Sequence, residues 1–137
     1  AMIHLRILTR KGTFLDQDVE SFIIPAHDGP LQIEAGYTPN ITACLEAGVM
    51  KIKTEGKTKF YALFRGILHV KPTEAILLAE AIEDGYEIDM ARAIASRDRN
   101  LDIIARNDGN DDVRHARISL AKQLARIQAK ELDEGGR

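Results

Sequence analysis

The sequence predicts a mainly β protein with an added α-helical part: an N-terminal antiparallel β-sandwich followed by a C-terminal two-helix hairpin. All seven aromatic residues, all four prolines and every threonine precede residue 87, and the rest is dominated by Ala, Arg, Asp, Leu and Ile. Aromatic and β-branched residues suit a pleated surface, whereas Ala, Leu and Arg lose little entropy in a helix. The composition changes near Gly85, so we expect two units, residues 1–85 and 86–137.

The first unit shows alternation with a period of two. Ile3, Leu5 and Ile7 are separated by polar residues, and lysines alternate with apolar residues over 49–54. Glu55-Gly56 then offers a tight hairpin turn into the next alternating stretch. Short strands separated by Gly- and Pro-containing turns indicate a sandwich or a barrel.

One segment of the first unit has two interpretations. Pro72-Thr73-Glu74 followed by residues 75–82 has the propensities of a helix start. The apolar run Ala75–Ala79 is also short enough to be a buried strand. Periodicity does not distinguish the two in so short a run.

The second unit reads as two helices. The first opens at Ile88-Asp89, with Asp89 as the cap, and runs to about Ala105. Residues 107–110 form a turn, and the acidic pair at 111–112 favours the start of a second helix through its dipole.

The second helix carries an apolar stripe at spacings of three and four, made of Val113, Ala116, Leu120, Leu124 and Ile127. Because the two helices are rich in alanine, they bury little area and need a further surface to rest on.

Charge and composition exclude several classes of protein. The 19 Lys and Arg nearly balance 21 Asp and Glu, so nucleic-acid binding is not expected. No apolar run is long enough to span a membrane, and no signal-peptide core is seen at the N-terminus. The single cysteine, Cys44, is expected to be a small buried residue in a reducing compartment, with a Cys–His nucleophile pair as the alternative.

No catalytic set or metal site is expected. The four histidines have neither a spacing of four nor a nearby cysteine pair, which a structural metal site would need; they are His4, His27, His69 and His115. We therefore do not expect an enzyme.

The basic residues of the hairpin fall at regular spacings. Such residues form either a solvated face paired with Asp and Glu or a surface that converges on an anion or an acidic partner. They are Arg92, Arg99 and Arg106 on the first helix, and Lys122, Arg126 and Lys130 on the second.

Several local motifs in one order resemble a known family. They are Gly36-Tyr37-Thr38-Pro39, the segment 66–72, the apolar run 76–79, the motif Ile88-Asp89-Met90-Ala91-Arg92-Ala93, and Ala116 with residues 120–126. Together they cover nearly the whole chain, which resembles the epsilon subunit of the F-type ATP synthase. Phe64-Arg65 departs from the family pattern, which has small residues there, and Gln32 and Tyr37 also depart from it.

The resemblance implies a fold and a role. It implies that the ambiguous segment is a strand that closes the sandwich. It also implies a non-catalytic rotor subunit that couples the gamma subunit to the c-ring and inhibits ATP hydrolysis through a mobile C-terminal hairpin. The implied partners are gamma, the polar loops of the c-ring, and the alpha and beta catalytic subunits. The implied location is the cytoplasmic face of the bacterial plasma membrane, where the chain is peripheral and meets the membrane only through the complex.

The resemblance further implies three sets of site residues and no required cofactor. ATP is a regulatory ligand in several bacterial members. Carried over by position, the nucleotide set is Glu83, Ile88, Asp89, Arg92, Ala93, Lys122 and Arg126. The rotor-contact set is His27, Asp28, Gly29, Leu31, Gly36, Tyr37, Thr38 and Pro39. The inhibitory set is Arg99, Arg106, Arg114, Arg117 and Arg126.

Other interpretations of these residues stay open. Asp89 is also explained as a helix cap, Arg92 as a surface residue, and the two turns as ordinary turn chemistry. At the level of the whole chain, one alternative is a free-standing ATP-sensing adaptor with no rotor partner. Another is a small β-barrel enzyme with a helical appendage, which would need a pocket with convergent polar groups.

Overall fold

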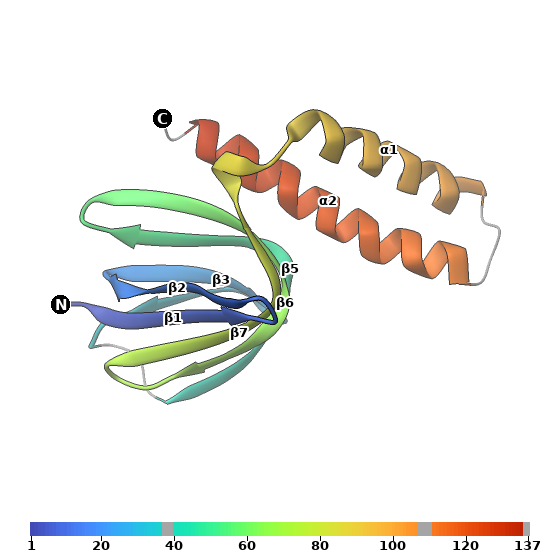
Figure 1. Ribbon diagram of the computed structural model, residues 1–137. Coiled ribbons are helices and arrows are strands. Elements are labelled where there is room, and N and C mark those ends of the chain that lie inside the picture. Colours follow the sequence, from blue (N-terminus) through green and yellow to red (C-terminus); the bar gives the residue numbers. More distant parts are fainter. Residues whose placement is uncertain (37–39, 107–110, 136–137) are drawn as a thin grey trace.

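The computed structural model describes residues 1–36, 40–106 and 111–135, with the backbone alone at Asp111 (Figure 1). A β-rich part is followed by two helices. The strands are β1 Ile3–Thr9, β2 Gly12–Val19, β3 Ser21–Ala26, β4 Gly29–Glu34, β5 Ile41–Thr54, β6 Lys57–Val70 and β7 Glu74–Asp84. A 3-10 turn, η1 Gly85–Glu87, leads to α1 Met90–Arg106 and α2 Asp111–Gly135.

The seven strands form one hydrogen-bonded sheet in the order β2-β1-β7-β6-β5-β3-β4. All seven contribute side chains to a single core, so the sheet curls over and encloses it as a sandwich does (Figure 1). The predicted fold class, a β domain followed by a helical hairpin, is confirmed. One detail of the predicted antiparallel sandwich is wrong: β1 and β7 pair in parallel, and five strands intervene between them along the chain.

The predicted alternation is confirmed where it was strongest. Ile3, Leu5 and Ile7 are fully buried, and the polar residues between them face outward. The turn between β5 and β6 uses Glu55 and Gly56 at φ of 50° and 76°. These left-handed angles match the twist of a tight hairpin.

A kink crosses three neighbouring strands at one level. Glu46 of β5, Arg65 of β6 and Glu80 of β7 lie side by side, and ladder pairing is interrupted there while the register continues unchanged on both sides. Arg65 has a φ of 63°, which is rare for a residue with a side chain. The alternation of buried and exposed residues shifts by one at this row, so Leu63 and Leu68 of one strand both reach the core.

The ambiguous segment is a strand. β7 pairs with β6 along nearly its whole length, and Ala75 and Leu77 are buried in the core. Tertiary pairing on both sides overrides the helical propensity of its alanines and glutamates.

The two helices pack against each other, and α2 lies between α1 and the sheet (Figure 1). The predicted apolar stripe of α2 is partly wrong. Val113 and Ala116 are buried, but Leu124 is 49% exposed, and the buried apolar positions nearer the C-terminus are Ala125 and Ala129. Close approach of α2 to the sheet requires small side chains there, so the large ones point away.

The expectation for Cys44 is also wrong. Its side chain is exposed on the outer face of β5, because the residues that reach the core in this part of the strand are the odd-numbered ones. Within the described ranges, no helix is both long and apolar enough to cross a membrane.

Candidate regulatory site between the sheet and the hairpin

A short connection joins the sheet to the hairpin. Asp84, at the end of β7, accepts a hydrogen bond from the backbone N–H of Tyr86 at 3.0 Å and caps η1. Its other carboxylate oxygen lies 2.8 Å from Nζ of Lys59 on β6, and this hydrogen bond raises the pKa of Lys59. The hairpin therefore leaves the sheet from a fixed point.

The first helix starts where the sequence predicts. The Asp89 carboxylate accepts a hydrogen bond of 3.1 Å from the backbone N–H of Arg92, three residues on. A side chain in this position satisfies an N–H group that the helix itself leaves unpaired. The predicted cap is confirmed.

A small apolar cluster lies where α2 meets the sheet. Its buried members are Ala62, Phe64, Ile88, Ala125 and Ala129. Three of the five are alanines, so the cluster removes much less apolar surface from water than the sandwich core does.

The backbone of α2 comes unusually close to the connection. A Cβ atom on Gly85 would lie 2.9 Å from the carbonyl oxygen of Ala129 and 2.7 Å from that of Phe60. Lys130 also donates a 2.7 Å hydrogen bond to the carbonyl oxygen of Tyr86. Glycine at 85 is therefore required by close approach, and α2 is tied directly to η1.

Arg126 is the most heavily engaged polar residue of this interface. Its Nε and Nη2 donate to the two carboxylate oxygens of Glu83 on β7, at 2.9 and 2.8 Å. Nη1 donates to Oε1 of Gln123 at 3.1 Å, and the guanidinium carbon lies 4.9 Å from the centre of the Phe64 ring. The fork of the guanidinium is thus matched by a carboxylate, over an aromatic face.

A cavity of about 410 Å³ opens beside this pair, between η1, α1 and α2. Six of the seven residues in the predicted nucleotide set line it: Glu83, Ile88, Asp89, Arg92, Ala93 and Arg126. The seventh, Lys122, lies 6.0 Å from the centre of the Phe64 ring and lines a separate cavity of about 350 Å³ between α2 and the sheet.

Sequence reasoning missed three lining residues of this cavity, Glu87, Ser96 and Gln123, and assigned a fourth, Arg99, to another role. Helical spacing carried a usable signal for Ser96 and Arg99, because they follow Arg92 by four and seven residues on one helix face. Gln123 precedes Arg126 by three residues and is found by the same rule.

Charges of both signs meet in this cavity. Three carboxylates face three guanidinium groups; these are Glu83, Glu87 and Asp89 against Arg92, Arg99 and Arg126. Such a lining suits a ligand that has an anionic part and also donates hydrogen bonds, as a nucleotide does.

The arginines of the predicted inhibitory set are spread over the docked hairpin. Arg99 and Arg126 line the 410 Å³ cavity, and Arg117 lines the cavity next to the sheet. Arg106 lies 3.8 Å from Asp102 on its own helix. The docked hairpin therefore does not gather them on one surface.

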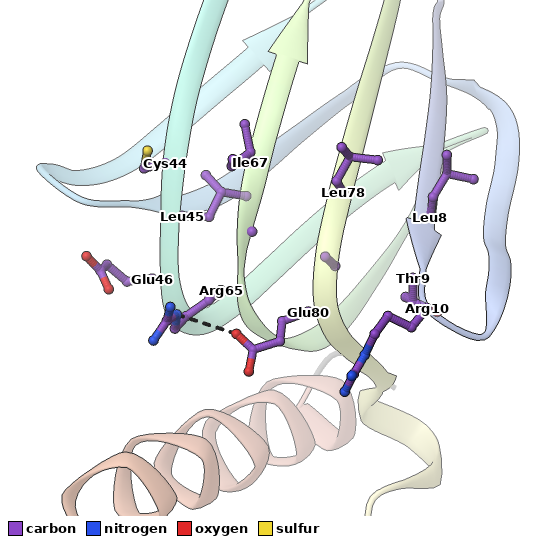
Figure 2. Close-up of a pocket in the computed structure, with 12 residues that line it drawn as sticks. Leu8, Thr9, Arg10, Cys44, Leu45, Glu46, Arg65, Ile67, Leu78 and Glu80 are labelled. Carbon is purple, nitrogen blue, oxygen red and sulfur yellow. Dashed lines mark ion pairs between the residues drawn. The ribbon is translucent and has the colours of Figure 1, made fainter. Parts of the chain in front are cut away.

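A second candidate surface lies on the outer face of the sheet (Figure 2). Leu8, Cys44, Ile67 and Leu78 line an open groove of about 640 Å³ across β1, β7, β6 and β5. Ile67 is 43% and Leu78 47% exposed, which is unusual for large apolar side chains side by side. Charged side chains of the kink row border the groove, and an ion pair of 3.5 Å joins Arg65 and Glu80.

Sequence reasoning missed this groove. The signal was present in the strand pattern, because the kink at Arg65 shifts the alternation and places Ile67 and Leu78 outward. A single period of two applied along each strand does not reveal that shift.

The predicted rotor-contact residues fall in three places. His27, Asp28 and Gly29 form the turn between β3 and β4, and Leu31 is packed against the core. Gly36 is exposed, whereas residues 37–39 lie outside the described residues.

The turn at residues 27–29 is linked to the groove by an ion pair. Nδ1 of His27 lies 2.7 Å from a carboxylate oxygen of Glu46, which borders the groove, and Glu46 raises the pKa of His27. The turn and the groove thus adjoin each other.

Fold and site together define a β-sandwich with a docked helical hairpin and a charged cavity at the hinge. Residues 2–85 match the family described as the ATP synthase Delta/Epsilon chain, beta-sandwich domain. The chain is 31% identical to the ATP synthase epsilon chain of Bacillus velezensis over 125 residues, which cover 91% of this chain and 94% of that one. It is 30% identical to the ATP synthase epsilon chain of Desulfitobacterium hafniense strain Y51, with 91% and 93% covered. The chain therefore belongs to the ATP synthase epsilon chain family, whose members are non-catalytic subunits, and the resemblance seen in the sequence is confirmed.

Solved structures show the same fold. A chain in the cryo-EM structure of the Euglena gracilis mitochondrial ATP synthase matches with a TM-score of 0.78 at 19% identity, over 96% of this chain and 82% of that one. A chain from the central stalk and c-ring structure of the Tetrahymena thermophila enzyme matches with a TM-score of 0.61 at 12% identity, over 95% and 94%.

Proposed function

We propose that this chain is a central-stalk subunit of an F-type ATP synthase that couples the gamma subunit to the c-ring and restrains ATP hydrolysis through its hairpin. Family membership supports the stalk role. The observation that supports a built-in partner surface is the exposed apolar groove on the sheet, which the docked hairpin leaves open (Figure 2).

The groove is proposed as the contact for gamma. Exposed apolar side chains bordered by charges are typical of a protein interface. Ile67 and Leu78 would lie at its centre, and the bordering ion pair of Arg65 and Glu80 would form part of a polar rim.

The turns beside the groove are proposed to contact the polar loops of the c-ring. The turn at 27–29 adjoins the groove through His27 and Glu46, and the other residues of the predicted rotor-contact set, Leu31 and 36–39, are included by family position alone. The exposed His27, whose pKa is raised by the Glu46 carboxylate, would face an acidic or polar loop. The chain would then be peripheral at the cytoplasmic face of the bacterial plasma membrane, held there through the complex.

The hairpin is proposed as the inhibitory part, acting on the alpha and beta catalytic subunits when it leaves the sheet. The alanine-rich interface supports this, because an interface of small residues separates at a low free-energy cost. Leaving the sheet would also free Arg126 from Glu83 and expose it with the other arginines of the hairpin to an acidic partner.

Reconstitution tests the stalk role. The full chain is mixed with a bacterial alpha–beta–gamma assembly that lacks its own epsilon chain, and co-elution and ATP hydrolysis are measured. We expect co-elution and slower hydrolysis, with co-elution lost in Leu78→Glu and retained in Met2→Glu, a control at another exposed apolar residue. A free-standing ATP-sensing adaptor would bind ATP without co-eluting.

The same assembly tests the electrostatic part of inhibition. Charge reversal at Arg106, Arg114 and Arg117 is expected to restore hydrolysis while co-elution persists. Intact inhibition in that variant would refute the role of these arginines.

ATP is proposed as a regulatory ligand of the 410 Å³ cavity, supported by its mixed charges and by the six motif residues that line it. Titration calorimetry on the full chain is expected to show saturable binding that is lost in Arg92→Ala. Lys122→Ala is the matched control, and we expect it to retain binding because Lys122 lies outside that cavity. Absence of binding heat at millimolar ATP would refute the proposal that ATP is a regulatory ligand, but it would not bear on the stalk role.

A further inference from the structure

We propose that Glu83, Phe64 and Arg126 form a latch that holds the hairpin on the sheet in the absence of any ligand. The inference rests on the proposed function in one respect, namely that the hairpin has a second, undocked position. It adds the residues that set how often the isolated chain occupies that position.

The latch joins the two parts of the molecule. Glu83 and Phe64 belong to the sheet, on β7 and β6, whereas Arg126 belongs to α2. The guanidinium makes two hydrogen bonds to the carboxylate, at 2.8 and 2.9 Å, and stacks over the ring at 4.9 Å. Both contacts break together when α2 moves away from the sheet.

The ion pair between Arg126 and Glu83 is partly buried and forked. The side chain of Arg126 is 28% exposed and that of Glu83 is 39% exposed. Forked, charge-assisted hydrogen bonds are the strong class, and partial removal from water reduces their screening by salt. Gln123, which is nearly buried, fixes the guanidinium from the same helix.

The rest of the interface between α2 and the sheet consists mostly of small side chains. Phe64 is the one large side chain that the sheet contributes to the buried cluster, and its neighbours there are mostly alanines. Lys130 ties α2 to the strands only indirectly, through η1, whereas Arg126 bonds to a side chain of β7 directly. α1 packs mainly on α2, so the position of the whole hairpin depends on how α2 is held.

Two residues of the latch, Glu83 and Arg126, also line the 410 Å³ cavity. Glu83 already supplies the anion that Arg126 requires, so a phosphate group entering the cavity would compete with Glu83 for that guanidinium. The docked state therefore does not depend on nucleotide.

The test measures the distance between the sheet and α2 in the full chain without nucleotide. Spin labels are placed on Cys44, the single cysteine of the chain and exposed on β5, and on a second cysteine introduced as Gln128→Cys on the exposed side of α2. Pulsed electron paramagnetic resonance then gives the populations of docked and open hairpins.

We expect one docked distance in the labelled parent. Glu83→Gln and Arg126→Gln should each add a longer-distance population and raise the ratio of open to docked chains roughly tenfold. The double variant should open no further than either single one, because both remove the same pair. Arg126→Lys, which keeps the charge and loses the fork, should fall between parent and Arg126→Gln.

The matched control is Glu74→Gln, which makes the same change on the same strand but at its opposite end, where the carboxylate is exposed. Unchanged distances in Glu83→Gln and Arg126→Gln, or equal opening in the control, would overturn the latch. If a Gln variant unfolds, as circular dichroism would show, Arg126→Lys decides: a parent-like distance distribution overturns the latch and partial opening supports it. Co-elution with gamma is measured separately, so a failed latch and a failed stalk role are distinguished.

Discussion

The sandwich core and the hairpin interface differ in the size of the side chains that they bury. The core holds buried Phe22, Met50 and many Ile, Leu and Val residues, and every strand contributes to it. The interface between α2 and the sheet is built around alanines with a single large ring, Phe64. Hydrophobic stabilisation follows the apolar area removed from water, so the two regions differ strongly in what each contributes.

Because of that difference, one short chain can combine a rigid β-sandwich with a helical hairpin that undocks from it. The strands are held by the large apolar area that they bury and by ladder hydrogen bonds along most of their length. The hairpin is held by a small patch and a few polar ties, which separate without disturbing the core. We expect substitutions to affect either the stability of the whole fold or the position of the hairpin, according to the region that they touch.

The largest effect is expected in the core. Leu77 is fully buried, whereas its neighbour Leu78 is 47% exposed on the same strand. Leu77→Ala should lower the free energy of unfolding by about 2–5 kcal/mol, because it removes buried methyl groups and leaves a cavity. Leu78→Ala is the control and should change it by about 0.5 kcal/mol or less. Both values come from urea denaturation, and similar values for the two variants would contradict the assigned faces of β7.

A smaller effect is expected from overfilling the hairpin interface. Ala129 is fully buried against the connection, so Ala129→Leu should cost about 1–3 kcal/mol. We expect this cost to appear as undocking, with greater proteolytic sensitivity of the hairpin and an unchanged core. Gln128→Leu, at the neighbouring exposed position, should behave like the parent. Loss of near-ultraviolet signal from the core aromatics in Ala129→Leu would mean that the two regions are not separable.

Loss of the cap of α1 should be smaller still and local. Asp89→Ala removes the hydrogen bond to the Arg92 backbone and should cost about 1 kcal/mol. Asp89→Ser restores an acceptor and serves as the control. Hydrogen exchange of the first-turn amides of α1 measures the change. Faster exchange that spreads into β7 would show that the cap supports the sheet as well.

The smallest effect concerns the edge of the sheet. His4 on β1 faces Asp16 and Asp18 on β2, with Nδ1 2.7 Å from Asp18, and these carboxylates, Asp18 first, raise the pKa of His4. A raised pKa stabilises the fold fully below the unfolded value of about 6.5, and that contribution disappears as pH rises through the folded value. The stability difference between the parent and His4→Gln should therefore shrink on raising the pH from 6 to 9. An NMR titration giving His4 a pKa at or below 6.5 would contradict this contact.

The sequence predicted the parts of the fold that follow from local pattern. The alternation of Ile3, Leu5 and Ile7, the Glu55-Gly56 turn and the Asp89 cap each depend on neighbours in the chain, and each is confirmed. The assignment of β7 as a strand needed the family resemblance. Its strand conformation depends on pairing with β1 and β6, and the local pattern of the segment does not reveal that pairing.

What the sequence could not show depends on contacts between distant segments. The kink at Arg65 shifts the exposed face of three strands at once, which places Cys44, Ile67 and Leu78 in a groove instead of a core. The predicted stripe of α2 included Leu124, whereas the buried apolar positions there are Ala125 and Ala129, because the close approach of the helix to the sheet excludes larger side chains. The motif residues of the cavity were identified by position, but the pairing of Glu83 with Arg126 joins residues 43 apart and appears only in the folded chain.

Native-state hydrogen exchange on the isolated full chain tests the central claim that the hairpin is a weakly docked unit on a rigid sheet. The account predicts that the amides of α1 and α2 open with a free energy clearly below that of the core strands β5, β6 and β7, because they are released by undocking before the sheet unfolds. One common opening free energy for helices and core strands, equal to that of global unfolding, would contradict it.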